Sequence, residues 1–351
     1  MTIIGIDAHK ATHTLVAVDH RGRKLGEKTV PATSAGHAGA IRWAHTAYDV
    51  NNLIWGVEDV RTVTARLERD LMDTGAVVVR VPPYLMARVR GSHRVAGKSD
   101  PIDALAVARA VLQEPNLPYA RHDPHSLACK LMTDRRDNLV RQRTAIMTRL
   151  QWRIHQLDPK RDLSQGKLQW TKHRDELISW LTTKDGLLAE FSRDEVYEIG
   201  QLSGKVVDLG HRITAYVEDV APSLLQIPGC GIVMAAKIVG ETADVTRFRS
   251  ESAFARFAGV GPLPKWSGNT TGTMRGNRSG NRQVNMALHR IAVVQLRMDG
   301  PGAAYYRTRT EAGDQPSKAR RCLKRHLARA VYRALKADNQ GREDAVRVGM
   351  G

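Results

Sequence analysis

Hydrophobic and polar positions alternate along residues 1–115 in a way that predicts strands and helices in turn. Short apolar runs rich in β-branched residues predict strands at Thr2–Asp7, Thr14–Asp19, Lys28–Pro31, Leu53–Glu58 and Ala76–Val81. Longer amphipathic stretches predict helices near Gly36–Tyr48, Thr62–Thr74 and Asp100–Leu112. Strands followed by helical crossovers are typical of an α/β layered domain.

After residue 120 the pattern becomes helical. His125–Leu157 predicts one long helix, and in Gln201–Val220 apolar residues recur about every 3.5 positions. Such a narrow seam predicts that the helix pairs with another helix. Two partners stay open at this point: an antiparallel helix of the same chain, or a coiled coil that joins two copies.

A third segment begins near Pro222. Leu225–Gly231, followed by a predicted helix over Ile232–Val239, resembles a helix-hairpin-helix, in which backbone N–H groups at a helix start bind a DNA phosphate. The same glycine-rich turn could simply connect two helices. The sequence therefore predicts three domains, at residues 1–120, 121–220 and 221–351.

The charge of the chain narrows the class of partner. Its 54 Lys and Arg against 36 Asp and Glu give a net charge of +18, which predicts binding to a polyanion. No apolar run reaches the roughly 20 residues of a membrane span, and the N-terminus lacks a signal-peptide pattern. The three widely spaced cysteines fit free thiols in a reducing cytosol. Nucleic acid in the cytoplasm is the predicted setting, with no membrane partner.

Basic residues concentrate in three places. Arg88–Lys98 is a glycine-interrupted basic loop, the helix at 125–157 is rich in arginine, and Ser252–Met298 contains no Asp or Glu at all. A glycine-rich, acid-free segment suits close approach to phosphates. The candidate nucleic-acid-binding residues are Arg88, Arg90, Arg94, Lys98, Arg135, Arg136, Arg143, Lys265, Arg275, Arg278 and Arg282.

Four carboxylates oppose this positive charge. Asp7 and Glu58 each end a predicted strand, and Asp100 and Asp103 share one face at the start of a helix. Clustered carboxylates are costly without a cation, and their oxygens are the ligands that Mg²⁺ prefers. A one- or two-ion Mg²⁺ site for phosphoryl transfer is the prediction. Read separately, Asp100 and Asp103 are also an ordinary helix start, and Asp7 a turn residue.

Taken together, these motifs resemble the IS110 family of insertion-sequence transposases. The Gly-Ile-Asp-x-x-Lys start, Glu58, and Lys98–Ala104 are similar to its RuvC-like DEDD domain. Farther along, Leu225–Gly231 and Phe254–Pro262 lead, as in the family, to Ser267-Gly268 and Arg275-Gly276-Asn277. The resemblance covers nearly the whole chain in the right order, which makes it specific where each motif alone is not.

The resemblance implies an α/β RuvC/RNase-H-like N-terminal domain, a helical coiled-coil insert that dimerises and binds RNA, and a mainly α C-terminal transposase domain. It implies Mg²⁺ at Asp7, Glu58, Asp100 and Asp103, and Ser267 as the nucleophile. The implied partners are double-stranded DNA of the element ends and target, a structured guide RNA, and further copies of the chain, as a dimer or as a tetramer on DNA. The implied setting is the bacterial cytoplasm.

Alternatives to this assignment stay open in the sequence. Ser279 is a rival nucleophile, and Asp59 could share or replace the ligand role of Glu58. A RuvC-like metal-dependent nuclease would use water and form no covalent intermediate. A non-catalytic nucleic-acid-binding protein would need none of the carboxylates.

Overall fold

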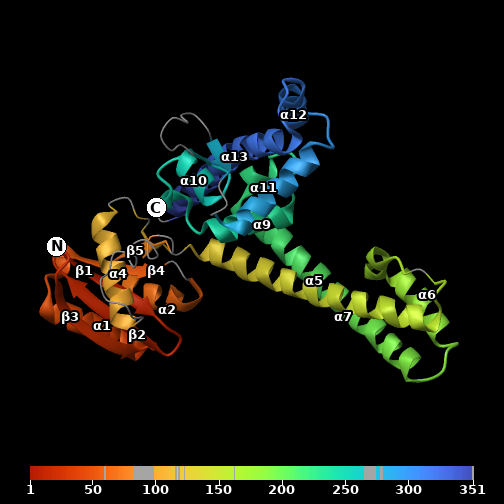
Figure 1. Cartoon of the computed structure of the whole chain (residues 1–351), viewed down its shortest axis with the longest axis horizontal. Helices are drawn as coiled ribbons and strands as arrows, with labels where there is room; N and C mark the ends of the chain where they lie inside the picture. Colours follow the sequence, from red (N-terminus) through yellow and green to blue (C-terminus); the bar gives the residue numbers. More distant parts are fainter. Residues whose placement is uncertain are drawn as a thin grey trace. The chain divides into compact units, whose positions relative to one another are not determined.

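The computed structural model describes residues 1–58, 61–82, 85, 99–114, 117, 119–121, 123–161, 163–264, 274–276 and 280–349. The chain divides into two compact units, Met1–His122 and Asp123–Gly351, and Figure 1 shows the elements of each. No helix in these ranges is long and apolar enough to span a membrane.

The first unit is built on a five-stranded mixed sheet with the order β3-β2-β1-β4-β5. β1 pairs antiparallel with β2, as β2 does with β3, whereas β1–β4 and β4–β5 are parallel. The strands are β1(Thr2–Ala8), β2(Thr12–Val18), β3(Lys24–Pro31), β4(Leu53–Glu58) and β5(Val77–Val81), and the helices are α1(Ser34–Ala47), α2(Arg61–Met72) and α4(Asp100–Gln113), with a 3₁₀ turn η1(Val50–Asn52). The predicted α/β architecture of the first unit is confirmed.

Strand β3 is longer than its sequence pattern indicates. It begins at Lys24 rather than Lys28, and most of its residues are exposed. Pairing of its backbone with β2, from Val18↔Lys24 to Thr12↔Pro31, makes it a strand. An edge strand that buries little apolar surface leaves only a weak hydrophobic pattern in the sequence.

The two faces of the sheet are covered by different helices. Ile3, Val16 and Val81 pack against α4, whereas Ile4, Trp55 and Val57 belong to the cluster that includes α1 and α2 side chains. Because side chains alternate along a strand, every second residue of β1 and β4 faces α4.

Helix α4 lies directly on the backbone of β1. A methyl group at Gly5 would be 2.1 Å from the Ala104 carbonyl oxygen and 2.4 Å from the Ala108 amide nitrogen. On β4, a methyl group at Gly56 would be 2.7 Å from Val111 Cγ2. The two glycines therefore set how closely α4 approaches the sheet.

Replacing Gly5 by Ala is expected to destabilise the chain by about 3 kcal/mol, the upper part of the range for overpacking, because backbone atoms block the methyl group. Urea unfolding measures this. Gly39→Ala in α1 is the matched control, since a Cβ there would lie 3.9 Å from Arg42 Nη2, an ordinary contact with a flexible side chain. This variant should be neutral or stabilising by up to about 1 kcal/mol. Equal stability of the two variants would contradict the close approach.

The other face of the sheet holds a buried pair of histidines. His13 on β2 and His37 on α1 are 2% and 1% exposed, and their rings stack with centroids 5.1 Å apart. His37 Nδ1 hydrogen-bonds Asp70 Oδ2 at 2.6 Å. Burial, with the neighbouring His37 second, lowers the pKa of His13 to about 4.

This pKa predicts a pH dependence of stability. A histidine whose pKa falls on folding binds its proton more weakly in the folded state. Its contribution to stability is therefore complete above pH 6.5 and is lost as the pH falls toward about 4. The loss corresponds to about 3 kcal/mol. Urea unfolding at several pH values measures the free energy of unfolding as a function of pH. His13→Phe should flatten this curve between pH 6.5 and about 4. His45→Gln, which changes an exposed residue of α1, should leave it unchanged.

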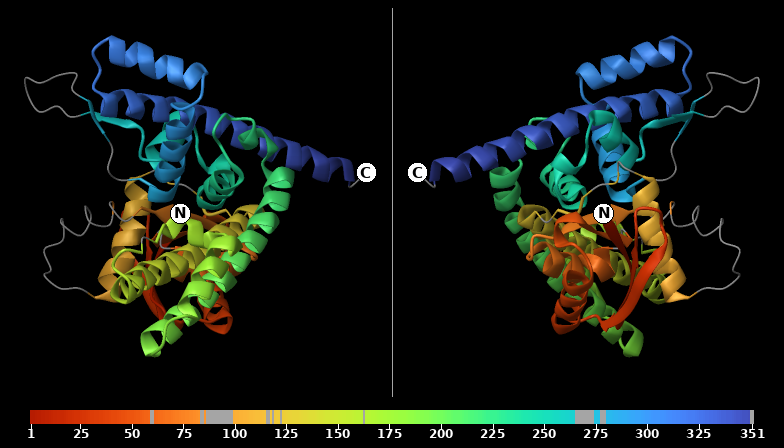
Figure 2. Two further views of the ribbon diagram at one scale, coloured as in Figure 1. Left: turned by 90° about the vertical axis from the view of Figure 1, so that its right-hand side faces the viewer. Right: turned by 90° about the vertical axis from the view of Figure 1, so that its left-hand side faces the viewer.

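In its described residues the second unit is helical apart from a short hairpin. Its helices are α5(Pro124–Leu157), α6(Thr171–Leu181), α7(Leu187–Val220), α8(Pro222–Leu225), α9(Ile232–Thr242), α10(Glu251–Phe257), α11(Arg282–Gln295), α12(Pro301–Glu311) and α13(Pro316–Gly349), with 3₁₀ turns η2(Gln165–Gln169) and η3(Val245–Arg247). The hairpin strands are β6(Pro262–Pro264) and β7(Met274–Gly276). Figure 2 shows α13 as one long helix that leads to the C-terminus.

The predicted seam of Gln201–Val220 packs within the chain. Arg143 of α5 donates to Ser203 of α7, and Arg149, farther along α5, pairs with Glu195, earlier in α7, so the two helices run antiparallel. Val206, Leu209, Ile213 and Val220 are buried in one cluster with residues of α5 and α9. The alternative left open by the sequence is resolved in favour of the intrachain pair, because α5 and α9 already cover this face of α7.

The segment after α7 joins two helices through a glycine turn, and its binding to a DNA phosphate stays a prediction. The four-residue α8 ends at Leu225, Gly229 has a φ of 80°, and α9 begins at Ile232. A Cβ at Gly229 would also lie 3.1 Å from the Ile291 carbonyl oxygen. The turn therefore requires a glycine both for its backbone conformation and for its contact with α11.

Candidate metal centre and serine segment

The strand ends of the first unit bring the predicted carboxylates to one edge and one face of the sheet. Ile6 of β1 pairs with Val57 of β4, so the next residues, Asp7 and Glu58, stand at neighbouring strand ends. Each follows by two residues a glycine that contacts α4, Gly5 or Gly56. Because residues two apart in a strand share a face, both carboxylates point to the α4 side. Asp100 and Asp103 lie in the first turn of α4.

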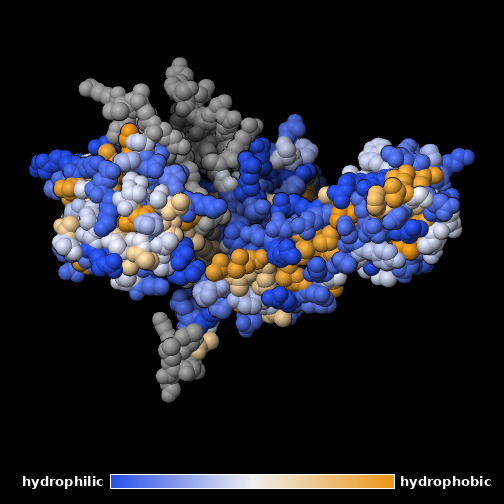
Figure 3. All heavy atoms as spheres, turned by 90° about the horizontal axis from the view of Figure 1, so that it is seen from below, coloured by the Kyte–Doolittle hydropathy of each residue, from blue (hydrophilic) through white to orange (hydrophobic). Residues whose placement is uncertain are grey.

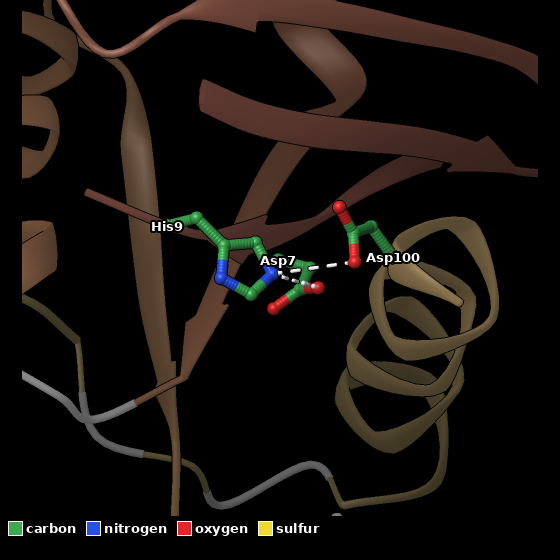
Figure 4. Close-up of side chains that lie close together, drawn as sticks. All are labelled: Asp7, His9 and Asp100. Carbon is green, nitrogen blue, oxygen red and sulfur yellow. Dashed lines mark hydrogen bonds and ion pairs between the residues drawn. The ribbon is translucent and has the colours of Figure 1, made fainter. Parts of the chain in front are cut away.

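Asp7 and Asp100 are joined by a histidine that the sequence analysis did not include. His9 Nε2 lies 3.0 Å from Asp7 Oδ2 and 3.4 Å from Asp100 Oδ1, as Figure 4 shows. One donor atom of each of these residues lies within 4.8 Å of the others. The signal was present in the sequence, because His9 follows Asp7 by two residues and such positions share a face in extended chain.

The electrostatics of Asp7 reflect this crowding. Burial raises its pKa, the charges of Asp103 and Asp100 raise it further, and His9 acts in the opposite direction. Asp7 and Asp103 are 9% and 5% exposed. Buried like charges at one strand end fit a divalent cation, whose charge would offset their repulsion. The oxygens of Asp7 and Asp100 suit a hard ion, and His9 adds a nitrogen donor.

Several predicted residues lie outside the described part of the chain. They are Asp59, Arg88, Arg90, Arg94, Lys98, Lys265, Ser267, Arg278 and Ser279. The segment that contains Ser267 connects β6 to β7, whose residues Pro264 and Met274 pair with each other.

The remaining predicted arginines occupy different surroundings. Arg135 and Arg282 are exposed, and Arg136 is half-buried. Arg143 is also half-buried, and it donates to Ser203 Oγ at 3.1 Å. Arg275 belongs to β7, where its backbone pairs with Leu263. The side chains of Arg135 and Arg282 are therefore open to solvent and accessible to a polyanion.

The residues just before α11 are tied to the end of α10. Gly280 and Gly259 pack so closely that a Cβ at Gly280 would lie 2.4 Å from the Gly259 Cα. Asn281 N donates to the Phe257 carbonyl oxygen at 2.6 Å, and Asn285 Nδ2 donates to the carbonyl oxygens of Ala258 and Gly259 at 2.9 and 3.1 Å. These bonds fix the start of α11 against the end of α10.

Comparison with known families identifies both halves of the chain. A family model of DEDD type, described as "Transposase", matches residues 4–159, and a model described as "Transposase IS116/IS110/IS902 family" matches residues 221–307. The chain belongs to the IS110 family of transposases. An IS110-family transposase is an enzyme that cleaves and recombines DNA.

Relatives of this transposase align along nearly its whole length. A 44.8 kDa protein of insertion element IS116 from Streptomyces clavuligerus is 23% identical over 95% of this chain and 94% of its own. A 42 kDa protein of element IS900 from Mycobacterium paratuberculosis is 23% identical over 95% of each chain. A 43.6 kDa protein of element IS110 from Streptomyces coelicolor is 21% identical over 95% of this chain and 93% of its own.

Solved structures similar to part of the transposase include RuvC of Thermus thermophilus. One is 17% identical over 34% of this chain and all of that chain, with a TM-score of 0.27. A second, RuvC in complex with a Holliday junction substrate, is 18% identical over 31% of this chain and 91% of that chain, with a TM-score of 0.24.

Proposed function

We propose that this transposase cleaves and rejoins DNA at the ends of its insertion element in a Mg²⁺-dependent reaction with Ser267 as the nucleophile. The observation that carries the metal-dependent part is the convergence of Asp7, Asp100 and Asp103 on one strand end of a chain with a net charge of +18. The resemblance to the family supports the role of Ser267.

The proposed chemistry is a phosphoryl transfer in two steps. Ser267 Oγ forms a bond to the phosphorus, the bond from that phosphorus to one DNA oxygen breaks, and the departing oxygen takes a proton. The serine proton passes to a base, since an unactivated serine is a weak nucleophile. Attack by a hydroxyl of the second DNA end then reverses the step and releases the serine.

Asp7, Glu58, Asp100 and Asp103 would hold the Mg²⁺, and His9 would orient Asp7 and Asp100 through its contacts with both. When bound, the ion supplies positive charge that stabilises the phosphate in the transition state. The residues of the chain arrange this site through the contact of α4 with Gly5.

We further propose the partners of the reaction: double-stranded DNA, a structured guide RNA and a second copy of the chain, acting in the bacterial cytoplasm. The positive charge supports both nucleic acids. Figure 3 shows apolar side chains on the surface of the α5–α7 pair, and the exposed ones include Leu131, Trp152, Tyr197 and Val207. Because the Gln201–Val220 seam is already filled, a dimer would use these outer positions.

A covalent-adduct assay tests the proposal. The protein, Mg²⁺, the RNA of the element and an end-labelled DNA with a nick beside the cleavage site are incubated and denatured, so that the cut fragment diffuses away and any protein-linked DNA accumulates. An adduct mapped to Ser267 by mass spectrometry is the expected result. Cleaved ends without an adduct would instead support a RuvC-like nuclease that uses water, and unchanged DNA would support a binding protein.

A further inference from the structure

The buried stripe of α13 changes from apolar to cationic along its length. Leu327, Val331 and Leu335 belong to the main core of the second unit. Lys324 and Arg320 lie on the same face, nearer the start of the helix. Lys324 is 9% exposed and Arg320 is half-buried. Burying cations at positions suited to leucine is costly unless they have a partner.

The partner that the described residues provide for Lys324 is a neutral amide. Lys324 Nζ donates to Asn285 Oδ1 at 2.6 Å, and it has no ion pair in the described residues. Arg320 Nε is buried with no hydrogen-bond partner in the same part of the chain. Other basic residues of α13 differ: Arg329 and Arg333 pair with Glu251, and Lys318 pairs with Asp314.

A third basic side chain faces the same place from α11, which packs against α13 (Figure 2). His289 follows Asn285 by one helical turn, so both share a face of α11. Burial and the charges of Lys324 and Arg320 lower the pKa of His289, and burial and Arg320 lower that of Lys324. Lys324 and Arg320 therefore repel each other, and both oppose the protonation of His289, which is exposed.

We propose that Lys324, Arg320 and His289 form an anion site for a backbone phosphate of the nucleic acid that this transposase binds. An anion there would offset the repulsion between Lys324 and Arg320, favour the protonated form of His289, and accept hydrogen bonds from Lys324 and from Arg320 Nε. The proposal rests on the proposed nucleic-acid function, but not on the covalent role of Ser267.

The site is linked to the end of α10 through Asn285. The Asn285 amide that accepts from Lys324 also donates to the carbonyl oxygens of Ala258 and Gly259. A phosphate held by Lys324 would therefore lie one side chain away from the turn that anchors Gly280 and Asn281. This places the phosphate site beside the junction between the end of α10 and the start of α11.

The test combines binding and stability of Lys324→Met, which keeps the length of the side chain and removes its charge. Affinity for an element-end DNA duplex and for an RNA of equal length is measured separately over a range of salt concentrations. We expect about tenfold weaker binding at low salt, a log–log salt slope smaller by about one for the polymer that uses the site, and a higher Tm without nucleic acid. Lys324→Arg should keep the wild-type slope.

The matched control is Lys318→Met, an exposed lysine of the same helix paired with Asp314, for which we expect a smaller change in slope and no rise in Tm. If Lys324→Met folds poorly, Arg320→Gln is measured in its place. It should lower the salt slope in the same way, because it loses the same phosphate contact. An unchanged slope with both polymers would overturn the site, as would weaker binding accompanied by a lower Tm, which would make Lys324 a packing residue. A Lys324-dependent slope in a protein that forms no Ser267 adduct would remove the serine mechanism and leave the anion site.

Discussion

Replacing Asp7 by Asn is expected to lower DNA cleavage about 10³-fold while leaving DNA affinity near the wild-type value. A metal ion contributes several kcal/mol to the stabilisation of a phosphoryl transition state, and each 1.4 kcal/mol corresponds to about tenfold in rate. Asn keeps the shape of Asp7 but loses the charge that opposes the cation. Initial rates of nicked-DNA cleavage at saturating Mg²⁺, with affinity measured in parallel, test this.

The same variant should be more stable than the wild type when no divalent ion is present. Burial and the charges of Asp103 and Asp100 raise the pKa of Asp7, so ionising this carboxyl costs folding free energy. In metal-free buffer the wild type should therefore gain stability as the pH falls through the raised pKa toward the ordinary carboxyl range, and Asp7→Asn should lack this gain. Mg²⁺ should raise the Tm of the wild type and not that of the variant.

Asp73→Asn is the matched control, because Asp73 is an exposed carboxylate just after α2, and it should change neither cleavage nor the Mg²⁺ response. If Asp7→Asn cleaved DNA at the wild-type rate, the carboxylates at this strand end would not form the metal site. A loss of cleavage together with a lower metal-free Tm would point to misfolding instead.

Ser267→Ala is expected to abolish the covalent adduct completely and to leave DNA binding and the Mg²⁺-induced rise in Tm intact. The variant removes the oxygen that forms the bond to phosphorus, whereas the carboxylates at the end of β1 are unchanged. Gel separation of labelled DNA under denaturing conditions measures the adduct, and a filter or mobility assay measures binding.

Two further variants sharpen this result. Ser279→Ala should form the adduct normally if Ser267 is the nucleophile, and a reversal of the two outcomes would assign the role to Ser279. Ser267→Cys retains a nucleophilic atom and should keep a small fraction of adduct formation. Cleavage by Ser267→Ala at the wild-type rate would favour water as the nucleophile.

The sequence predicted the first unit well because its information is local. Apolar runs ending in Asp7 and Glu58 indicated parallel strand ends, and the Asp100-Pro101 start placed two carboxylates in one helical turn. It under-predicted β3, whose exposed residues are held by backbone pairing with β2. It also began α7 at Gln201 rather than Leu187, since the first turns of α7 lack the regular seam and become helical in contact with α5 and α6.

The sequence by itself determined the acidic cluster, the basic character and the family, because residue types and their order along the chain contain all three. Only the tertiary structure decided that His9 joins Asp7 to Asp100, that the seam of α7 is covered within the chain, and that Lys324 is buried against Asn285. Each of these depends on which elements pack together. A pattern along one helix or strand shows that a face is buried, and the partner on that face is selected by the packing of the whole unit.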